Sequence, residues 1–343
     1  MKAAIYNQYL DTLGGGERYT IEFAIVLAKN GYEVDVEWDD PKILSIIAKR
    51  FGFKLPKNIK IVSSIQKGKD YDLCFWVSDG SIPNLLARRN FIHFQVPFKD
   101  VGGRSLINKM KLFKVEKVIC NSNFTKKIVD EEFGVDSFCL YPPIDVVSFR
   151  PRRKEKLIIY VGRFSNLLQS KGQEVLIEQF KKLCGLGISD YKLVLAGGVE
   201  VGSEKYLSKL EKLVDNYPIE IIKSPSFSKL KELYGKSKIF WSASGYGVDE
   251  NLNPHQVEHF GMTLVEAMSA GCVSVVSSVG GHKEIISDKI DGFLWNNSNE
   301  LIEITNQLLT VKGFAYKISK ESISKSKKFA ISEFEKKVLQ IIR

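Results

Sequence analysis

Two glutamates, Glu258 and Glu266, lie eight positions apart in the stretch VEHFGMTLVEAMSAG, residues 257–271. Thr263 precedes Glu266 by three residues, which matches the S/T-x-x-E capping box and predicts a helix with Thr263 as its N-cap. A cap accounts for Glu266 but leaves Glu258, on the other side of Gly261, unexplained. Carboxylates on both sides of a glycine corner are suited to holding the hydroxyl groups of a ligand.

Two basic residues in the second half of the chain are candidates for binding phosphate. Arg163 follows the apolar run LIIYVG, and Lys171 precedes Gly172 at the expected start of a helix. Cations at a strand end and at a neighbouring helix start are well placed to hold a diphosphate and to stabilise charge that grows on a departing phosphate. The alternative is a pair of solvated cations, which is common in a chain with 50 basic residues.

A run of three glycines, Gly14, Gly15 and Gly16, separates the first apolar strand from a helical segment. Glycines at such a corner let backbone N–H groups approach a ligand, and the following helix N-terminus adds positive potential. The run is neither a GxGxxG fingerprint nor a P-loop, because no Gly-Lys-Ser/Thr follows. We favour a loop that approaches a ligand closely over a tight turn, because a turn needs fewer glycines.

The elements that must position these residues are short apolar strands alternating with longer helical patterns, which is typical of parallel sheets in an α/β protein. In the first half, strands are expected at 2–7, 33–38, 72–77, 90–96, 117–122 and 137–142, with an apolar helix at 17–28. In the second half, they are expected at 157–164, 191–198, 219–224, 238–244 and 272–278. Residues 142–156 contain three prolines and many charges, which indicates a linker.

The length of 343 residues favours two domains. Two α/β halves joined by a linker predict a cleft, with ligands at the carboxyl ends of the strands. The last segment, 329–343, is predicted to be an amphipathic helix. The apolar residues expected on one face of it are Phe329, Phe334, Val338 and Ile342.

The net charge of +10 fits nucleic acid, an anionic membrane surface or phosphorylated small molecules. No aromatic-basic reading motif is present, so nucleic acid is not an expected partner. The five cysteines form no CxxC pair, which favours a reducing, cytoplasmic setting. The apolar stretch at the start of the sequence is too short and too polar for a signal peptide, and no run of 18 apolar residues occurs. A cytoplasmic protein is expected, with a peripheral contact to the inner face of the membrane as an option.

Over essentially its whole length the chain resembles glycosyltransferase family 4, which comprises retaining enzymes of the GT-B fold. The matching motifs, in order, are GGGER, VICNSNFTKKIV, LYPPID, YVGRF followed by KG, YKLVLAGG, EHFGMTLVE, AMSAG and GGHKEII. GGGER, YPPID and EHFG are also similar to the mannosyltransferases that extend dolichol-linked oligosaccharides. The resemblance implies Rossmann-like domains at 1–145 for the acceptor and 146–320 for the nucleotide sugar, with a C-terminal helix, 321–343, packing back on the first domain.

The resemblance also implies roles for the basic and acidic residues. Arg163 and Lys171 would hold the donor diphosphate, Glu266 would accept hydrogen bonds from the ribose hydroxyls, and Glu258 would face the transferred sugar. At the helix N-terminus, phosphate would meet the backbone amides of Gly261, Met262 and Thr263, and the glycine loop would contribute Gly15 and Gly16.

A histidine, His93 in NFIHFQVPF, falls where the family often has one near the transferred sugar. Taken alone, a single histidine after an apolar run is more often a packed residue. The family implies transfer from a nucleotide diphosphate sugar, GDP-mannose or a UDP-hexose, to a hydroxyl of a lipid-linked or polysaccharide glycan. The anomeric configuration would be retained.

No metal cofactor is expected. Asp70-Tyr71-Asp72 matches the DxD of metal-dependent transferases, but it precedes a strand far from the nucleotide residues and is interpreted as a solvated strand entry. The histidines show no zinc-ligand spacing. Two other functions stay open: a UDP-sugar 2-epimerase on the same fold, and a non-catalytic nucleotide-sugar-binding subunit. The latter has no need of two cations and two acids together.

Two segments depart from the family. Residues 245–257, GYGVDENLNPHQV, are longer and more polar than the usual loop, which leaves the sugar undetermined. Residues 99–117 combine cations with apolar Leu106, Met110, Leu112 and Phe113. This composition is typical of a binding surface for anionic lipid or phosphate, and a solvated helix face is the alternative.

Overall fold

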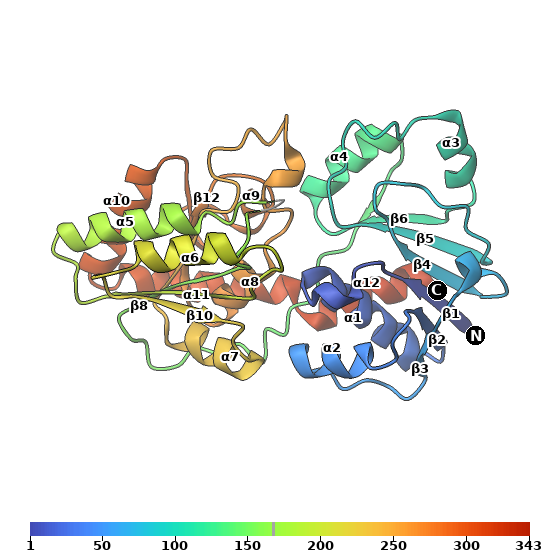
Figure 1. Ribbon diagram of the computed structural model, residues 1–343, viewed down its shortest axis with the longest axis horizontal. Coiled ribbons are helices and arrows are strands. Elements are labelled where there is room, and N and C mark those ends of the chain that lie inside the picture. The colour runs from blue at the N-terminus through green and yellow to red at the C-terminus, as the bar shows by residue number, and fades with distance from the viewer. Residues whose placement is uncertain (167–168) are drawn as a thin grey trace. The chain divides into compact units, whose positions relative to one another are not determined.

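The computed structural model describes residues 1–166 and 169–343, which form two compact units (Figure 1). The first unit contains Met1–Pro143 together with Ile331–Arg343, and the second contains Ile144–Ala330. Each unit has a parallel sheet, so the predicted α/β fold with two Rossmann-like domains is confirmed. The chain leaves the first unit after residue 143 and returns to it at residue 331.

The sheet of the first unit has seven parallel strands in the order β3-β2-β1-β4-β5-β6-β7. Their bounds are Lys2–Tyr6 (β1), Glu33–Glu37 (β2), Ile59–Val62 (β3), Leu73–Val77 (β4), Arg89–Phe94 (β5), Lys117–Cys120 (β6) and Phe138–Cys139 (β7). The strand order reverses at β1, and ligands of open α/β sheets bind beyond the carboxyl ends of strands at such a point. The glycine run at 14–16 lies at the start of the α-helix that follows β1, after a short 3-10 helix at Leu10–Thr12.

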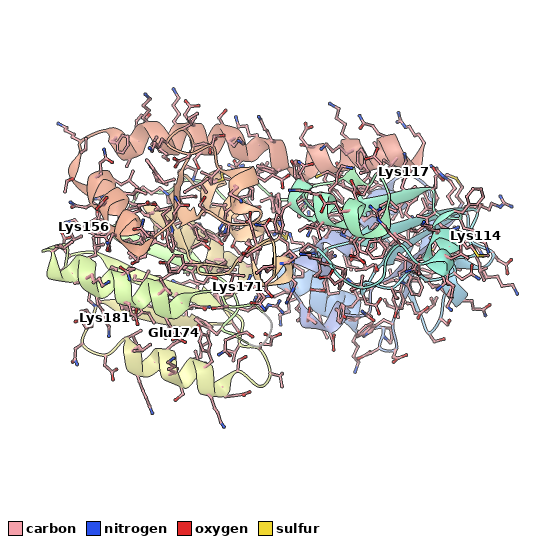
Figure 2. All side chains as sticks on the ribbon, turned by 90° about the horizontal axis from the view of Figure 1, so that it is seen from above. Lys114, Lys117, Lys156, Lys171, Glu174 and Lys181 are labelled. Atoms are coloured by element: carbon pink, nitrogen blue, oxygen red, sulfur yellow. The ribbon has the colours of Figure 1, made fainter. Side chains whose placement is uncertain are left out.

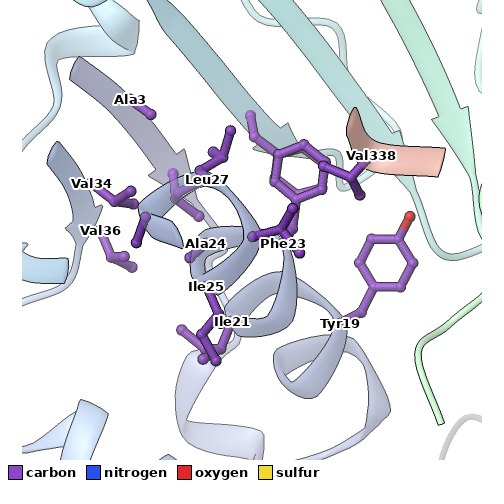
Figure 3. Close-up of a cluster of buried hydrophobic side chains, with 14 of the residues drawn as sticks. Ala3, Tyr19, Ile21, Phe23, Ala24, Ile25, Leu27, Val34, Val36 and Val338 are labelled. Atoms are coloured by element: carbon purple, nitrogen blue, oxygen red, sulfur yellow. The ribbon is translucent and has the colours of Figure 1, made fainter. Parts of the chain in front are cut away.

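Helices cover both faces of this sheet, because alternate residues of each strand point to opposite sides. One face carries α1 (Gly15–Lys29), α2 (Ile43–Phe51) and α12 (Ile331–Ile342), and the other carries α3 (Leu106–Leu112) and α4 (Asn123–Phe133) (Figure 1). Short 3-10 helices are η1 (Leu10–Thr12) and η2 (Gln66–Gly68). In the core beneath α1, Phe23 and Leu27 lie in one cluster with Val338 of α12 (Figure 3).

The sheet of the second unit has six parallel strands in the order β10-β9-β8-β11-β12-β13. The strands are Leu157–Val161 (β8), Lys192–Gly197 (β9), Ile219–Lys223 (β10), Ile239–Ser242 (β11), Val273–Ser277 (β12) and Phe293–Trp295 (β13). The helices are α5 (Gln173–Gly185), α6 (Glu204–Leu213), α7 (Phe227–Lys236), η3 (Pro254–Gln256), α8 (Met262–Ser269), α9 (His282–Ile285), α10 (Ser298–Thr310), α11 (Phe314–Ser326) and η4 (Lys327–Phe329). The order reverses at β8, so the loops after β8 and β11 leave the sheet side by side.

The last helix differs in one residue from the expectation. Phe329 was predicted on its apolar face, but this residue lies in η4, and its ring packs against Phe260 of the second unit with centroids 5.4 Å apart. Phe334, Val338 and Ile342 of α12 are buried as predicted. The Arg89 guanidinium donates hydrogen bonds to the carbonyls at the end of α12 and thereby holds this helix on the first unit.

Among the helices of residues 1–166 and 169–343, none is both long enough and apolar enough to cross a bilayer.

Candidate active site

An ion pair joins two residues that are far apart in the sequence at the carboxyl edge of the second sheet. The Nζ atom of Lys171 lies 3.0 Å from Oε2 of Glu258, and the two side chains are only 14% and 21% exposed. Gly172 places the lysine by capping α5 with a positive φ of 67°. A Cβ atom on Gly172 would lie 2.5 Å from the carbonyl oxygen of Ala243, which follows β11, so only glycine fits here. Figure 2 labels Lys171 within this unit.

The carboxyl group of Glu258 is held in its ionised form. Partial burial raises the pKa of this carboxyl group. The nearby Lys171 and His282 lower the pKa by more than burial raises it, so the net pKa is about 2. The Lys171 ammonium also donates to Oε1 of Gln169 at 2.6 Å, so two acceptors fix its position. Glu258 therefore carries its negative charge at neutral pH, next to the Lys171 side chain at this edge of the sheet.

His282, at the start of α9, completes this cluster, and sequence reasoning did not single it out. Its side chain is 1% exposed, and its Nδ1 lies 2.9 Å from the carbonyl oxygen of Ser277. A carbonyl only accepts, so Nδ1 carries the proton in this arrangement. Burial lowers the pKa of His282, although the nearby Glu258 acts in the opposite direction. The available signal was the motif GGHKEII, which contains His282 and which entered the sequence analysis only as a family motif.

The backbones of two loops pack directly on one another around Glu258. The N–H of Gly281 donates to the carbonyl oxygen of Glu258 at 2.6 Å. A Cβ atom on Gly280 would lie 2.3 Å from that oxygen, and one on Gly281 would lie 2.5 Å from Cα of Phe260. Both glycines are therefore required for contact between the loops, and this contact sets the position of Glu258.

The predicted capping box at Thr263 is wrong. Helix α8 begins at Met262, and its N-cap is Gly261, with a φ of 113° and no side-chain cap. Glu266 lies inside the helix, 7% exposed, where the Tyr234 hydroxyl donates to its Oε2 at 3.3 Å. The physical reason is that the left-handed glycine makes the corner alone, while Glu266 is turned toward a buried tyrosine. The first amides of α8, at Met262 and Thr263, have no intrahelical acceptor.

Arg163 lies beyond the end of β8 and takes a different partner from Lys171. Its guanidinium is half exposed, with Nη1 3.5 Å from Oε1 of Glu200 in the loop after β9. The ends of β8 and β9 approach so closely that a Cβ atom on Gly197 would lie 1.9 Å from the carbonyl oxygen of Gly162. Arg163 and Lys171 thus belong to the same edge of the sheet, and each is held by a separate acid.

The long segment 245–257 is tied to this edge through Glu250. The carboxylate of Glu250 accepts a hydrogen bond from the N–H of Gly280 at 2.7 Å and pairs with Lys283. Glu250 therefore holds the glycine loop that packs on Glu258. Sequence reasoning identified the segment as unusual but not this acid.

The glycine run in the first unit has a structural explanation. Gly14 is the N-cap of α1, and its N–H donates to Oε2 of Glu17 at 2.6 Å. A Cβ atom on Gly16 would lie 2.0 Å from Oε1 of Gln95, so the close approach at Gly16 is made by a side chain of the protein. Gly15 is exposed at the first residue of the helix. The amides at this helix start stay a predicted ligand site.

His93 lies on β5 with no exposed side-chain surface. Its ring stacks on Tyr19 at a centroid distance of 4.1 Å, and its Nδ1 lies 3.2 Å from the carbonyl oxygen of Ile119. Burial lowers its pKa to about 3. The role of His93 near the transferred sugar stays a prediction.

The Asp70-Tyr71-Asp72 stretch forms local contacts before β4. The Asp72 carboxylate accepts the backbone N–H of Lys2 at 2.8 Å and pairs with Arg88 at 3.1 Å. The Tyr71 hydroxyl donates to Asp35 at 2.8 Å. These contacts agree with a strand entry.

Comparison with known proteins bears on both units. The chain is 25% identical over 240 residues to a GDP-Man:Man(3)GlcNAc(2)-PP-Dol alpha-1,2-mannosyltransferase of Dictyostelium discoideum, which covers 64% of this chain and 45% of that protein. It is 23% identical over 227 residues to the phosphatidylinositol N-acetylglucosaminyltransferase GPI3 subunit of Saccharomyces cerevisiae, covering 60% of this chain and 46% of that protein. The alignments thus span less than half of these curated relatives.

Among solved structures, HepE of Anabaena in complex with UDP-glucose superimposes with a TM-score of 0.76 at 16% identity. The superposition covers 100% of this chain and 99% of HepE, so the GT-B fold is shared throughout. The family model described as glycosyl transferases group 1 matches residues 145–325, which is more than half of the chain and includes the whole charged edge of the second sheet. The chain therefore belongs to the group 1 glycosyl transferases.

Proposed function

We propose that this protein transfers a hexose from a nucleotide diphosphate sugar to an acceptor hydroxyl with retention of anomeric configuration. The observation that carries the proposal is the ionised Glu258 paired with Lys171 at the carboxyl edge of the second sheet. A donor of this class needs cations for its diphosphate and acceptors for its hydroxyl groups at one place. This edge supplies both, next to the open amides at the start of α8.

The diphosphate would be held by Lys171, Arg163 and the amides of Met262 and Thr263. When the bond from the sugar to the phosphate breaks, negative charge grows on the leaving diphosphate, and these groups stabilise it without reorganising. Two side-chain cations and a helix N-terminus supply this charge from the protein, so we propose that no divalent metal is needed. Activity that survives excess EDTA is the expected result.

Glu258 would contact the sugar as a carboxylate rather than as an acid. With a pKa of about 2, it does not donate a proton at neutral pH, but it accepts hydrogen bonds from sugar hydroxyls. Its negative charge also stabilises the positive, oxocarbenium-like sugar of the transition state. We propose attack from the same face as the departing phosphate, assisted by that phosphate, and this route gives retention without a protein nucleophile.

Glu266 would accept hydrogen bonds from the ribose hydroxyls. Tyr234 already donates to one of its oxygens, so the carboxylate is orientated before the donor binds. The donor is proposed to be GDP-mannose or a UDP-hexose. The relatives support this range, because one is named as a GDP-mannose enzyme and a structural neighbour holds UDP-glucose. The proposed acceptor is a glycan, free or linked to lipid.

The test is incubation with GDP-mannose, UDP-glucose or UDP-N-acetylglucosamine in the presence of glycan and lipid-linked acceptors, with nucleotide release measured and the new anomeric centre analysed by NMR. Lys171→Met and Glu258→Gln should each reduce nucleotide release about 100-fold or more. The matched control is the exposed pair Lys192 and Glu220, where Lys192→Met and Glu220→Gln should leave the rate unchanged.

The same assay separates the rival functions. Release of a C2-epimerised nucleotide sugar without acceptor identifies an epimerase and overturns transfer. Donor binding by the wild-type protein without turnover, in the presence of glycan and lipid-linked acceptors, identifies a binding subunit. A product of inverted anomeric configuration would support sugar transfer but contradict the proposed retention of configuration.

A further inference from the structure

Helix α3 presents large apolar side chains to solvent. Leu106, Ile107, Met110 and Phe113 are each between 66% and 94% exposed, and the helix buries none of its residues. Isolated exposed hydrophobic residues are ordinary, but four of them on one short helix and its C-cap form a patch. We call these four residues the α3 patch. Leu112, predicted to be among them, instead packs against the core with Val115.

The segment that carries the α3 patch is rich in cations. Residues 99–117 contain six lysines or arginines and two acids. One of these acids, Glu116, is already paired with Arg89, because its oxygens lie 2.6 and 2.7 Å from the guanidinium nitrogens. Lys109, Lys111 and Lys114 lie on α3 or directly after it, and Figure 2 labels Lys114 and Lys117 on this part of the first unit. The surface is therefore both apolar and positive.

The segment before α3 is held firmly on the body of the first unit. The carboxylate of Glu132, on α4, accepts three backbone N–H groups, from Asp100 at 2.9 Å, Val101 at 3.2 Å and Gly103 at 2.8 Å. The Ser105 hydroxyl then caps α3 by accepting the N–H of Asn108 at 3.3 Å. With Leu112 and Val115 anchored in the core, the α3 patch is displayed by a fixed helix rather than by a loose loop.

We propose that the α3 patch docks this protein on an anionic lipid bilayer. Apolar side chains would enter the boundary between headgroups and acyl chains, while lysines on the same helix meet headgroup phosphates. Charge favours this occupant over a protein partner, because the centres of protein interfaces are depleted in lysine. The docking is independent of the donor chemistry proposed above, and each can fail alone.

The experiment is co-sedimentation of the full chain with phosphatidylcholine vesicles, with and without phosphatidylserine. We expect binding to the anionic vesicles at about 0.1 M salt and much weaker binding at about 1 M, where charges are screened within roughly 3 Å. Lys109→Gln with Lys114→Gln should lower the affinity about 25-fold, since each lysine near an anionic surface contributes about fivefold. Ile107→Ser with Phe113→Ser should abolish binding at both salt concentrations.

The matched control changes equally exposed residues on α11 of the second unit, Tyr316→Ser with Lys317→Gln, and should bind like the wild type. Nucleotide release from a soluble donor without vesicles should be the same in all these variants. The proposal is overturned if the wild type does not sediment, if the control loses as much binding as the α3 variants, or if light scattering shows a dimer that Phe113→Ser dissociates.

Discussion

The pair of Lys171 and Glu258 makes a quantitative prediction about stability. Because the two side chains are 14% and 21% exposed, their attraction is only weakly screened by solvent. The pKa of Glu258 falls from 4.5 in the unfolded chain to about 2 in the folded protein, and a change of one in pKa corresponds to a free energy of about 1.4 kcal/mol. Keeping this carboxylate charged therefore contributes about 3 kcal/mol to the free energy of unfolding at pH 7.

The perturbation is Glu258→Gln, alone and combined with Lys171→Met. The single change should cost about 3 kcal/mol at pH 7, because it leaves the lysine in a partly buried site without its acid. The cost should shrink with acid. Below pH 4.5 this carboxyl group is protonated in the unfolded state, whereas in the folded state it stays ionised down to about pH 2. Its contribution to the free energy of unfolding is therefore lost between pH 4.5 and about pH 2. At pH 3 the difference should be about 1 kcal/mol.

The assay is urea unfolding followed by the fluorescence of Trp241 and Trp295, which are buried in the second unit. A double-mutant cycle isolates the coupling between the lysine and the glutamate, and we expect about 2 kcal/mol or more. The exposed pair Lys192 and Glu220, at 44% and 45% exposure, is the control and should couple by less than about 1 kcal/mol. A coupling no larger than this control, or a cost of Glu258→Gln that does not change with pH, would refute the reasoning.

Four further changes test other contacts. Gly261→Ala forces an alanine to a φ of 113° and should cost about 1–3 kcal/mol while weakening donor binding, measured by urea unfolding and calorimetric titration. Arg89→Ala removes the hydrogen bonds at the end of α12, so hydrogen exchange of residues 331–342 should accelerate. In the folded state His93 is protonated only near pH 3, whereas in the unfolded state it is protonated below about pH 6.5, so the free energy of unfolding falls as the pH is lowered. His93→Phe should make the free energy of unfolding less dependent on pH in this range. Loss of nucleotide release in the same variant would support the predicted catalytic role of His93. Glu250→Gln frees the glycine loop and should lower kcat with little change in stability, as seen in turnover and unfolding assays.

The fold was largely predictable because parallel strands buried on both faces appear as separate apolar runs. Two strands were missed: β3 has the sequence IKIV, in which a lysine interrupts the apolar run, and β13, FLW, has only three residues. The positions of Arg163 and Lys171 followed from the same reasoning, since each stands directly after a strand or before a helix. The edge of the second sheet was therefore within reach of sequence reasoning.

The partners of these residues were not predictable, because they depend on which loops meet. Glu250 lies in the loop before α8, and His282 begins α9. Both residues meet the site only because Gly280, next to α9, bonds to Glu250 and packs on Glu258. The sequence Thr-x-x-Glu fits a capping box equally well whether or not a buried tyrosine takes the glutamate. Likewise, nothing local distinguishes a glycine that approaches a ligand from Gly16, which makes room for Gln95.

The two glutamates eight residues apart are held by different physical means, and this difference suits the two parts of a donor that we propose they bind. Glu266, on α8, is held by a hydrogen bond from the Tyr234 hydroxyl of α7, which sets the orientation of its carboxyl group. Glu258 is fixed by Lys171 and by the backbone of Gly281, so its charge depends on the cation that would also meet the diphosphate. In the proposed donor complex, a phosphate that drew Lys171 away would leave the backbone of Glu258 held by Gly281 and would free its carboxylate for the sugar. Binding of the leaving group would thereby prepare the carboxylate that stabilises the reacting sugar.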